Sequence, residues 1–316
     1  MLTVCTYNIR FILDRWPERK PLVEHELRRA KADLYALQEV NIGGHNFGQH
    51  IQLPATALPA NESYETFEAP AARRYFETLP LLGWLFTTSN PLAAWAYDFC
   101  AWFNERFLAS ILGGHVQWLY YHPILQIVTF LGLGTAWVFG TTVYARKSIA
   151  PKHHTQLLIG GWKVAQRVVV TVDGVDIHVV NVHLASDRDE ERFRVEQVRT
   201  IADWIAATTS GTNVIIMGDF NCEPNKACYL YLKQRGFTSA HMQVHGVEPD
   251  VTFHQGLEAP TKDVGTEVCL DYIFYKGQMT PKTIALVGTK PDPNDSTLYP
   301  SDHFGLLATF QVGRAN

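Results

Sequence analysis

Short runs of alternating apolar and polar residues recur along the chain, with the period expected of β-strands that bury one face. One apolar run, residues 214–217, lacks the alternation, as expected of a strand covered on both faces. Asp173-Gly174 separates two of the runs and predicts a hairpin turn. The predicted strands are residues 2–10, 33–39, 140–149, 163–172, 175–184, 214–217, 270–275, 283–287 and 304–312.

A helical period of three to four residues occurs in fewer places. It predicts one helix over residues 21–32 with proline in its first turn, a second from Phe193 to about Ser210, and a third over residues 226–235 closed by Gly236. Many strands with hairpins and few helices favour an α/β fold of two packed sheets over a parallel doubly wound sheet. No linker composition or internal repeat divides the chain, so a single domain over residues 1–316 is expected.

Residues 79–138 depart from this pattern. They hold five of the eight tryptophans, and no charged residue occurs between Phe107 and Ala145. A run of this length is sufficient to span a bilayer, but it also fits a hairpin that lies in the membrane interface, or a pair of helices buried in an ordinary core. We interpret the segment as an apolar, helical insertion, and its tryptophans favour contact with a membrane surface.

Composition limits the class of protein. The net charge of −4 provides no overall basic field, so nucleic-acid binding is not supported by charge, although it is not excluded. The five cysteines are odd in number and form no C-x-x-C pair, which argues against a disulfide framework and a structural zinc site. The first residues alternate like a strand and lack the features of a secretory signal. An intracellular location, cytoplasmic or peripheral to a membrane, is therefore expected.

An acid and an amide, Asp219 and Asn221, follow the apolar run 214–217. Side chains two residues apart on an extended strand project to the same face, and this pair suits a hydrated divalent metal, a phosphate oxygen or an attacking water. Asn8 and Glu39 also end predicted strands, and their oxygens are natural ligands for Mg²⁺. Taken singly, each of these residues is more often a strand-end cap or a solvated polar group.

Two histidines occupy comparable positions. His183 ends the predicted strand 175–184, and His303 precedes the last strand. A lone histidine at a strand end is usually structural. A carboxylate that hydrogen bonds one imidazole nitrogen, however, fixes the tautomer and raises the basicity of the ring. Asp271 opens another predicted strand, and an Asp271–His303 pair would be a competent acid or base.

Six short motifs occur in order along the chain: T-Y-N-I-R, L-Q-E-V, N-V-H-L, G-D-F-N, L-D-Y-I-F and S-D-H-F. Together, from Thr6 to Phe304, they resemble the signature segments of the endonuclease/exonuclease/phosphatase superfamily, the DNase I-like fold. The resemblance covers most of the chain outside the tryptophan-rich insertion. It implies a four-layer α/β sandwich of two mainly antiparallel sheets flanked by helices, and a Mg²⁺-dependent phosphoesterase for which Mn²⁺ is a possible substitute.

The resemblance also implies a metal site and contacts to substrate. Glu39 is similar to the principal metal ligand of the family, with Asn8 beside it and Asp302 as a second metal or water ligand. Arg10 and Arg146 follow strand segments that family members place near the catalytic face. Contact with the substrate phosphate is the expectation for both arginines, and a surface ion pair is the alternative.

The remaining motif residues resemble the catalytic groups of the family. Asp219 and Asn221 are similar to the pair that orients the attacking water and the phosphate. His303, oriented by Asp271, is similar to the catalytic histidine, and His183 matches a histidine that contacts the phosphate or protonates the leaving oxygen. The resemblance leaves open whether a histidine or an aspartate is the general base, and whether one or two metals bind.

The substrate is less determined than the reaction. The segment 269–276 and Arg194-x-x-Gln197 are similar to neutral sphingomyelinases, whereas residues 218–230 and 300–304 are similar to nocturnin- and angel-type deadenylases. Because an uncharged, tryptophan-bearing hairpin suits a lipid interface, the leading hypothesis is a membrane-associated phosphodiesterase acting on a phospholipid or sphingolipid headgroup. The alternative is a nuclease, deadenylase or phosphatase acting on RNA or a soluble phosphate ester. The sequence leaves the oligomeric state open.

Overall fold

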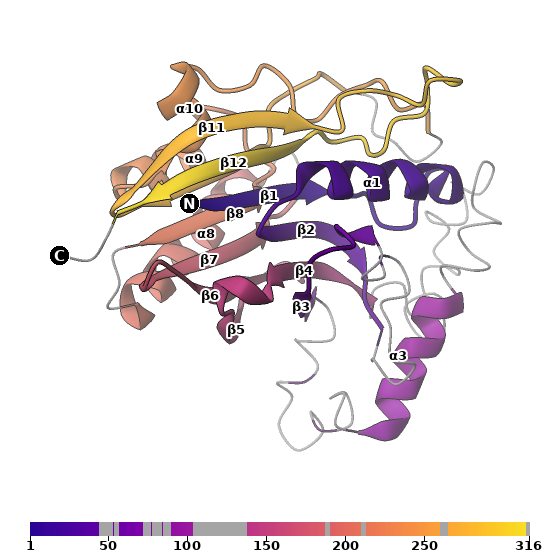
Figure 1. Cartoon of the computed structure of the whole chain (residues 1–316), viewed down its shortest axis with the longest axis horizontal. Helices are drawn as coiled ribbons and strands as arrows, with labels where there is room; N and C mark the ends of the chain where they lie inside the picture. The colour runs from indigo at the N-terminus through magenta and orange to yellow at the C-terminus, as the bar shows by residue number, and fades with distance from the viewer. Residues whose placement is uncertain are drawn as a thin grey trace.

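The computed structural model describes residues 1–43, 53, 57–71, 77, 84, 90–103, 138–186, 190–209, 213–259 and 265–313, and their strands form two six-stranded sheets (Figure 1). The first sheet has the order β11-β12-β1-β2-β4-β3, and the second has the order β5-β6-β7-β8-β10-β9. The strands of the first sheet are β1 (Leu2–Asn8), β2 (Leu34–Asn41), β3 (Tyr64–Pro70), β4 (Phe139–Arg146), β11 (Met279–Val287) and β12 (Gly305–Val312). Those of the second are β5 (Lys152–Leu158), β6 (Val164–Val172), β7 (Val175–His183), β8 (Val214–Asp219), β9 (Thr238–Ser239) and β10 (Asp271–Lys276).

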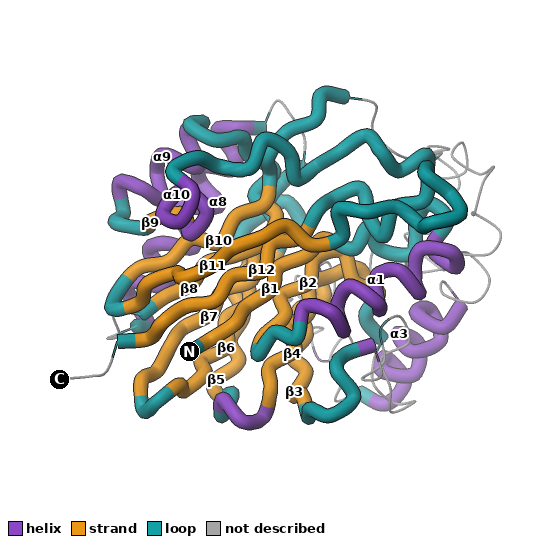
Figure 2. Tube along the Cα trace, turned by 45° about the horizontal axis from the view of Figure 1, so that its top comes forward, coloured by secondary structure: helices purple, strands orange, loops and turns teal. Residues whose placement is uncertain are grey.

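The helices are α1 (Trp16–Ala30), α3 (Pro91–Phe103), α8 (Glu191–Thr208), α9 (Ala227–Gln234) and α10 (Ala240–His245), with a short 3₁₀ turn, η5 (Lys147–Ile149). Helix α1 covers the outer face of the first sheet, and α8 and α9 cover that of the second. Helix α10 contacts β10 of the second sheet and β11 of the first. Figure 2 shows α8, α9 and α10 grouped together, with α1 and α3 lying apart from them.

The two faces of β1 show how the layers are built. Leu2 and Val4 are buried in the core between the sheets, whereas Cys5 and Tyr7 belong to a second core that includes Val23 of α1. A third core packs residues of α8 and α9 against the second sheet. Because alternate residues of one strand enter different cores, both faces of the central strands are apolar. The order is helix, sheet, sheet, helix, which confirms the expected four-layer sandwich.

Each sheet contains one parallel pair among its described strands, β1 beside β2 in the first and β7 beside β8 in the second. The other pairs are antiparallel. Parallel neighbours end at the same edge of a sheet, and an antiparallel neighbour begins there. In both sheets the site residues lie at or near these strand ends. Asn8, Glu39 and His303 belong to the first sheet, and His183, Asp219 and Asp271 belong to the second.

The structure differs from the sequence-based prediction mainly at the sheet edges. Neither β3 nor β5 was predicted, and both are edge strands with many partly exposed residues, so the apolar alternation is weak. Helix α1 begins at Trp16 rather than at residue 21. Pro17 occupies its first turn, where a missing N–H costs no hydrogen bond, and Pro21 lies inside the helix.

Most of the predicted insertion, residues 79–138, lies outside the described residues. The described part includes one helix, α3, and the helical character of the rest of the insertion stays a prediction. No helix among the described residues is both long enough and apolar enough to cross a membrane.

A buried polar link joins the two sheets. Gln38 of β2 donates to the side-chain oxygen of Asn181 of β7 over 2.7 Å, and Asn181 donates back to the carbonyl of Leu37 over 3.1 Å. Gln38 also donates to the Thr6 hydroxyl over 3.1 Å. Both amide side chains are fully buried. Unmaking such bonds would leave buried polar groups unpaired, so the link opposes sliding of one sheet over the other.

Gly218 is required by the close approach of β7 to β8. Its φ is 146°, and a Cβ at this position would lie 1.9 Å from the carbonyl oxygen of Val182. We therefore expect Gly218→Ala to be strongly destabilising in urea unfolding. The matched control is Gly174→Ala, because Gly174 has a φ of 80° but a Cβ there would meet no atom within 4 Å.

The free energy of unfolding of the control should fall by about 1–2 kcal/mol through backbone strain alone. Gly218→Ala should lose about 1–3 kcal/mol more, because the β7 backbone must move. Equal losses in the two variants would show that the contact with Val182 is unimportant.

Candidate active site

The site begins with two carboxylates, one from each sheet, joined by a single amide. Nδ2 of Asn8 donates to Oε1 of Glu39 over 3.0 Å and to Oδ2 of Asp219 over 3.0 Å. Glu39 lies where the register between β2 and β4 shifts, and its φ is 55°. This irregularity interrupts the ladder at the strand end and re-aims the side chain, as bulges beside active sites commonly do.

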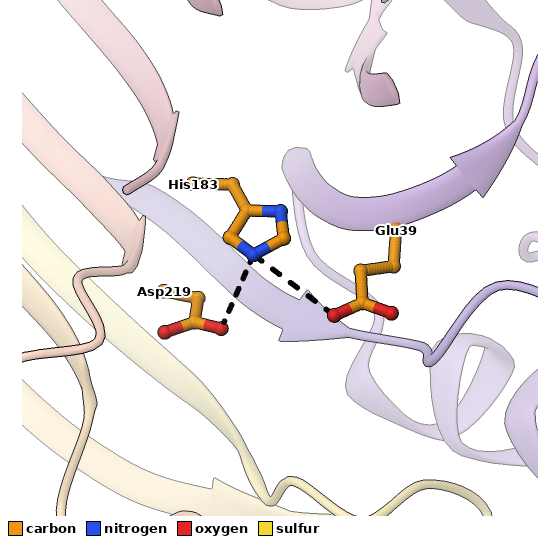
Figure 3. A group of neighbouring side chains, drawn as sticks. All are labelled: Glu39, His183 and Asp219. Carbon is orange, nitrogen blue, oxygen red and sulfur yellow. Dashed lines mark ion pairs between the residues drawn. The ribbon is translucent and has the colours of Figure 1, made fainter. Parts of the chain in front are cut away.

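His183 completes the first cluster (Figure 3). Its Nε2 lies 3.7 Å from Oδ2 of Asp219 and 3.9 Å from Oε1 of Glu39, and the figure shows the three side chains pointing toward one another. Their donor atoms all lie within 4.8 Å of one another. Carboxylate oxygens and an imidazole nitrogen at this spacing fit a divalent metal ion. Asn8 turns its Nδ2 toward the carboxylates, while its Oδ1 accepts from the backbone N–H of Arg10, so its role as a ligand stays a prediction.

A second cluster contains His303. Its Nδ1 lies 2.9 Å from Oδ2 of Asp271, and its Nε2 lies 3.8 Å from Oδ2 of Asp219. Asp271 pairs directly with Asp219 across β8 and β10, so the strand register places both carboxylates beside the same imidazole. Burial would lower the pKa of His303, but the charges of Asp271 and Asp219 outweigh it and raise the pKa to about 10. The ring is therefore a cation at neutral pH.

Asp219 connects the two clusters. Burial raises the pKa of Asp219 to about 7, against the lowering effect of nearby His303. Its Oδ1 accepts from the backbone N–H of Asn221 over 2.9 Å. Asn221 in turn donates its side-chain N–H to the carbonyl of Leu184 over 3.2 Å. A carboxylate whose pKa lies near neutrality is suited to accept a proton during a reaction.

The two predicted substrate-binding arginines have different positions. Arg10 lines the cleft and pairs with Asp302 over 2.5 Å and with Asp14 over 2.6 Å. Asp302 also lines the cleft, but its carboxylate is engaged by Arg10 and it belongs to neither donor cluster of the described residues. Its expected role as a metal or water ligand therefore stays a prediction.

The prediction that Arg146 contacts substrate is wrong. β4 is antiparallel to β2, so Arg146, at its end, lies opposite the start of β2, at the far edge of the sheet from Glu39. There it pairs with Asp33 over 2.9 Å and with Glu62 over 3.4 Å, which is the surface ion pair named as the alternative.

The motif residues line a cleft of about 990 Å³. Several other residues that line the cleft were not identified by the sequence motifs, among them Phe139, Lys163, Ser186 and Lys226. Lys163 is the most significant, because its Nζ lies 3.1 Å from Nε2 of His183. Burial and the charge of Lys163 hold the pKa of His183 well below its ordinary value, so this imidazole is neutral. Lys163 immediately precedes β6 at the point where the antiparallel β7 ends, and this topological signal could have placed it beside His183.

A two-sheet α/β sandwich with carboxylate, amide and histidine groups at one edge defines a phosphoester hydrolase of the DNase I-like class. The chain belongs to the Endonuclease/Exonuclease/phosphatase family, whose family model matches residues 5–303. This membership confirms the fold class and the reaction class expected from the sequence.

Individual relatives agree with this assignment. Tyrosyl-DNA phosphodiesterase 2 from Gallus gallus is 24% identical over 155 residues, or 46% of this chain and 41% of the relative. Nocturnin from Xenopus laevis is 32% identical over 142 residues, or 40% of this chain and 35% of the relative. The matched segments thus span less than half the length of either relative.

Solved structures extend the likeness over the whole fold. Humanized D. rerio TDP2 has a TM-score of 0.64 at 18% identity, covering 98% of this chain and 99% of that chain. The human nocturnin catalytic domain with a bound sulfate anion has a TM-score of 0.62 at 18% identity, covering 99% and 93%.

The Asp271–His303 pair makes the stability of the metal-free protein depend on pH. A group whose pKa is raised on folding stabilises the folded state fully below its unfolded pKa, and this stabilisation is lost as pH rises through the folded pKa. For His303 the window therefore runs from about pH 6.5, its unfolded value, to about 10, the raised pKa. We expect Asp271→Asn to flatten the fall in unfolding free energy across this window, measured by urea unfolding in chelator.

The control is Asp203→Asn, which removes an exposed carboxylate paired with Arg235. It should keep the wild-type slope. Parallel curves for the wild type and Asp271→Asn would show that Asp271 does not hold the proton on His303.

Proposed function

We propose that the chain is a Mg²⁺-dependent phosphodiesterase that hydrolyses a phosphoester bond at the end of a single-stranded nucleic acid. The observation that carries the reaction is the pair of clusters around Asp219, a metal-compatible group on one side and the Asp271–His303 pair on the other. The substrate class is supported by the relatives, which include a tyrosyl-DNA phosphodiesterase and a D. rerio TDP2 crystallised with a single-strand DNA product. This function is closer to the alternative expected from the sequence, a nuclease or phosphatase acting on RNA or a soluble phosphate ester, than to the leading lipid hypothesis.

The chain's own residues divide the chemistry by their charge states. Asp219, with its raised pKa, accepts a proton from the attacking water, and Asn8 and Asn221 hold the two carboxylate oxygens in place. The His303 imidazolium donates a hydrogen bond to a phosphoryl oxygen as negative charge builds there. Neutral His183 lies on the other side of Asp219 from His303, where its ring can hydrogen bond to the leaving oxygen.

The oxygen donors of Glu39 and Asp219 are the kind that Mg²⁺ prefers, and Mn²⁺ accepts the same set together with the His183 nitrogen. Such an ion, when bound, supplies Lewis-acid polarisation of the phosphoryl oxygen and lowers the pKa of water. Glu39 is suited to anchor it because this side chain is partly exposed at the cleft, whereas Asp219 is almost fully buried.

Glu39→Gln tests this function. The variant keeps the shape of the side chain but removes a charge, so we expect turnover of a single-stranded oligonucleotide to fall by about 10²-fold or more, and the Mg²⁺ concentration for half-maximal rate to rise. The matched control is Glu65→Gln, an exposed residue of β3 in the same sheet. Wild-type protein that cleaves neither single-stranded DNA nor RNA with Mg²⁺ or Mn²⁺ would refute the proposal.

A second candidate, a phosphodiester in a lipid headgroup, is favoured by one feature of α3. Leu92, Trp95, Phe99 and Trp102 are 80%, 54%, 40% and 41% exposed, and Trp95 and Phe99 stack with ring centroids 5.6 Å apart. Their spacing places them on one face of the helix, and the opposite face buries Ala94. An exposed aromatic face of this kind suits a lipid interface.

Vesicle binding tests this second candidate. We expect wild-type protein to co-sediment with phosphatidylcholine–sphingomyelin vesicles, and the double variant Trp95→Ala/Trp102→Ala to lose most of that binding because it removes aromatic area from the interface. Trp162→Ala, at another exposed tryptophan, should bind like the wild type. Failure of the wild type to bind vesicles, or equal binding by all variants, would remove the lipid candidate and leave the nucleic-acid proposal intact.

A further inference from the structure

The loop between β5 and β6 is a tight, well-anchored hairpin. The backbone N–H of Ile159 donates to the carbonyl of Lys163, and that of Lys163 donates to the carbonyl of Gly160, each over 3.1 Å. Gly160, Gly161 and Trp162 have φ values of 82°, 60° and 56°. Gly160 and Gly161 adopt positive φ without strain, whereas a positive φ is rare for a bulky residue such as Trp162, so the conformation of Trp162 is held by its surroundings.

Those surroundings connect the hairpin to the active-site strand β7. The side chain of Gln197 on α8 donates to the carbonyl of Gly160 over 3.2 Å and accepts from the backbone N–H of Ala185, just after β7, over 2.9 Å. The ring of Phe193 packs so closely that a Cβ on Gly161 would lie 2.7 Å from it. The hairpin and the end of β7 are thus positioned by the same helix.

This anchoring directs Lys163 into the cleft. Its Nζ lies 3.1 Å from Nε2 and 3.4 Å from Nδ1 of His183, and 5.7 Å from the centre of the Phe139 ring. The charges of Glu39 and Asp219 act on Lys163 strongly enough to oppose the effect of burial on its pKa, which is nevertheless lowered. The lysine therefore stands beside the metal-compatible cluster, on the His183 side.

The cations of the cleft differ in what they contact. Arg10 contacts two almost fully buried carboxylates, Asp14 and Asp302, so its charge is balanced within the protein. Lys163 lines the cleft with its Nζ against the His183 imidazole, on the side of the cluster formed by Glu39, His183 and Asp219. A phosphodiester brings a negative charge into a site already rich in carboxylates, and it requires a cation on the side away from His303.

We propose that Lys163, presented by the β5–β6 hairpin, forms a phosphate subsite that binds a non-bridging oxygen of the substrate phosphoryl group. The ammonium lies next to His183, so a phosphate bound to it is held beside that imidazole. The inference rests on the proposed phosphoester substrate and adds a binding residue to it. It does not depend on whether the rest of the substrate is nucleic acid or lipid, because the phosphoryl oxygens are common to both.

Binding of inorganic phosphate, measured by calorimetry with saturating Mg²⁺, tests the subsite without any turnover. We expect Lys163→Met, which keeps the length of the side chain but removes its charge, to weaken phosphate binding about tenfold or more. Lys163→Arg should retain affinity within about threefold, since a cation is restored. The matched control, Lys152→Met, removes an exposed lysine of the same hairpin that pairs with Asp176, and it should bind like the wild type.

Two further measurements separate binding from structure. Thermal melting should show that Lys163→Met is folded, and Lys163→Gln serves the same purpose if the methionine variant is not. Titration with Mg²⁺ alone should show metal affinity no weaker than the wild type. With a single-stranded oligonucleotide, the Michaelis constant should rise more than the turnover number falls.

Unchanged phosphate affinity in folded Lys163→Met would overturn the subsite, as would a loss fully explained by weaker Mg²⁺ binding. Loss of phosphate binding in a protein that cleaves no phosphodiester would support the subsite while refuting the proposed function. Normal cleavage by the wild type, with unaffected kinetics in Lys163→Met, would support the proposed function while refuting the subsite.

Discussion

The position of Asp219 is the constraint on which the rest of the site depends. β8 lies between β7 and β10, and the register sets His183 directly across from Asp219 on one side and Asp271 on the other. One carboxylate is therefore a neighbour of both clusters, and a shift by one residue in either ladder would turn these side chains to the other face of the sheet. Gly218 permits the close strand approach that this register needs.

Two groups of buried charges in the site have opposite charges as neighbours. His303 carries a proton between Asp271 and Asp219, and Arg10 balances Asp14 and Asp302. Burying an ion without a partner is costly, so the removal of one member changes the protonation of the others. Burial and the charge of Lys163 lower the pKa of His183, whereas the carboxylates of Asp271 and Asp219 raise the pKa of His303 despite its burial. At neutral pH the two histidines of one cleft therefore differ in charge: His183 is neutral, and His303 is a cation.

Much of the fold could be predicted from the sequence, because the central strands are buried on both faces and their apolar runs are unambiguous. The edge strands β3 and β5 could not, since partly exposed strands carry a weak pattern. The motif residues that end parallel strands were brought together as expected, but Arg146 was misplaced because proximity to a strand end does not say which edge that end faces. Lys163 was missed for the complementary reason: it lies just before β6, and antiparallel pairing brings the start of β6 beside the end of β7.

The buried link between Gln38 and Asn181 has a consequence for how the enzyme would lose its activity. Gln38 precedes Glu39, and Asn181 lies two residues before His183, so the link lies directly behind the contact between the two half-sites. Each sheet can keep its own hydrogen-bonded ladder while the pair loses its mutual alignment. A small displacement of one sheet would separate Glu39 and Asn8 from Asp219 while leaving the secondary structure intact. Catalysis in this molecule therefore depends on the alignment between the two sheets, and this alignment is lost more easily than the secondary structure of either sheet.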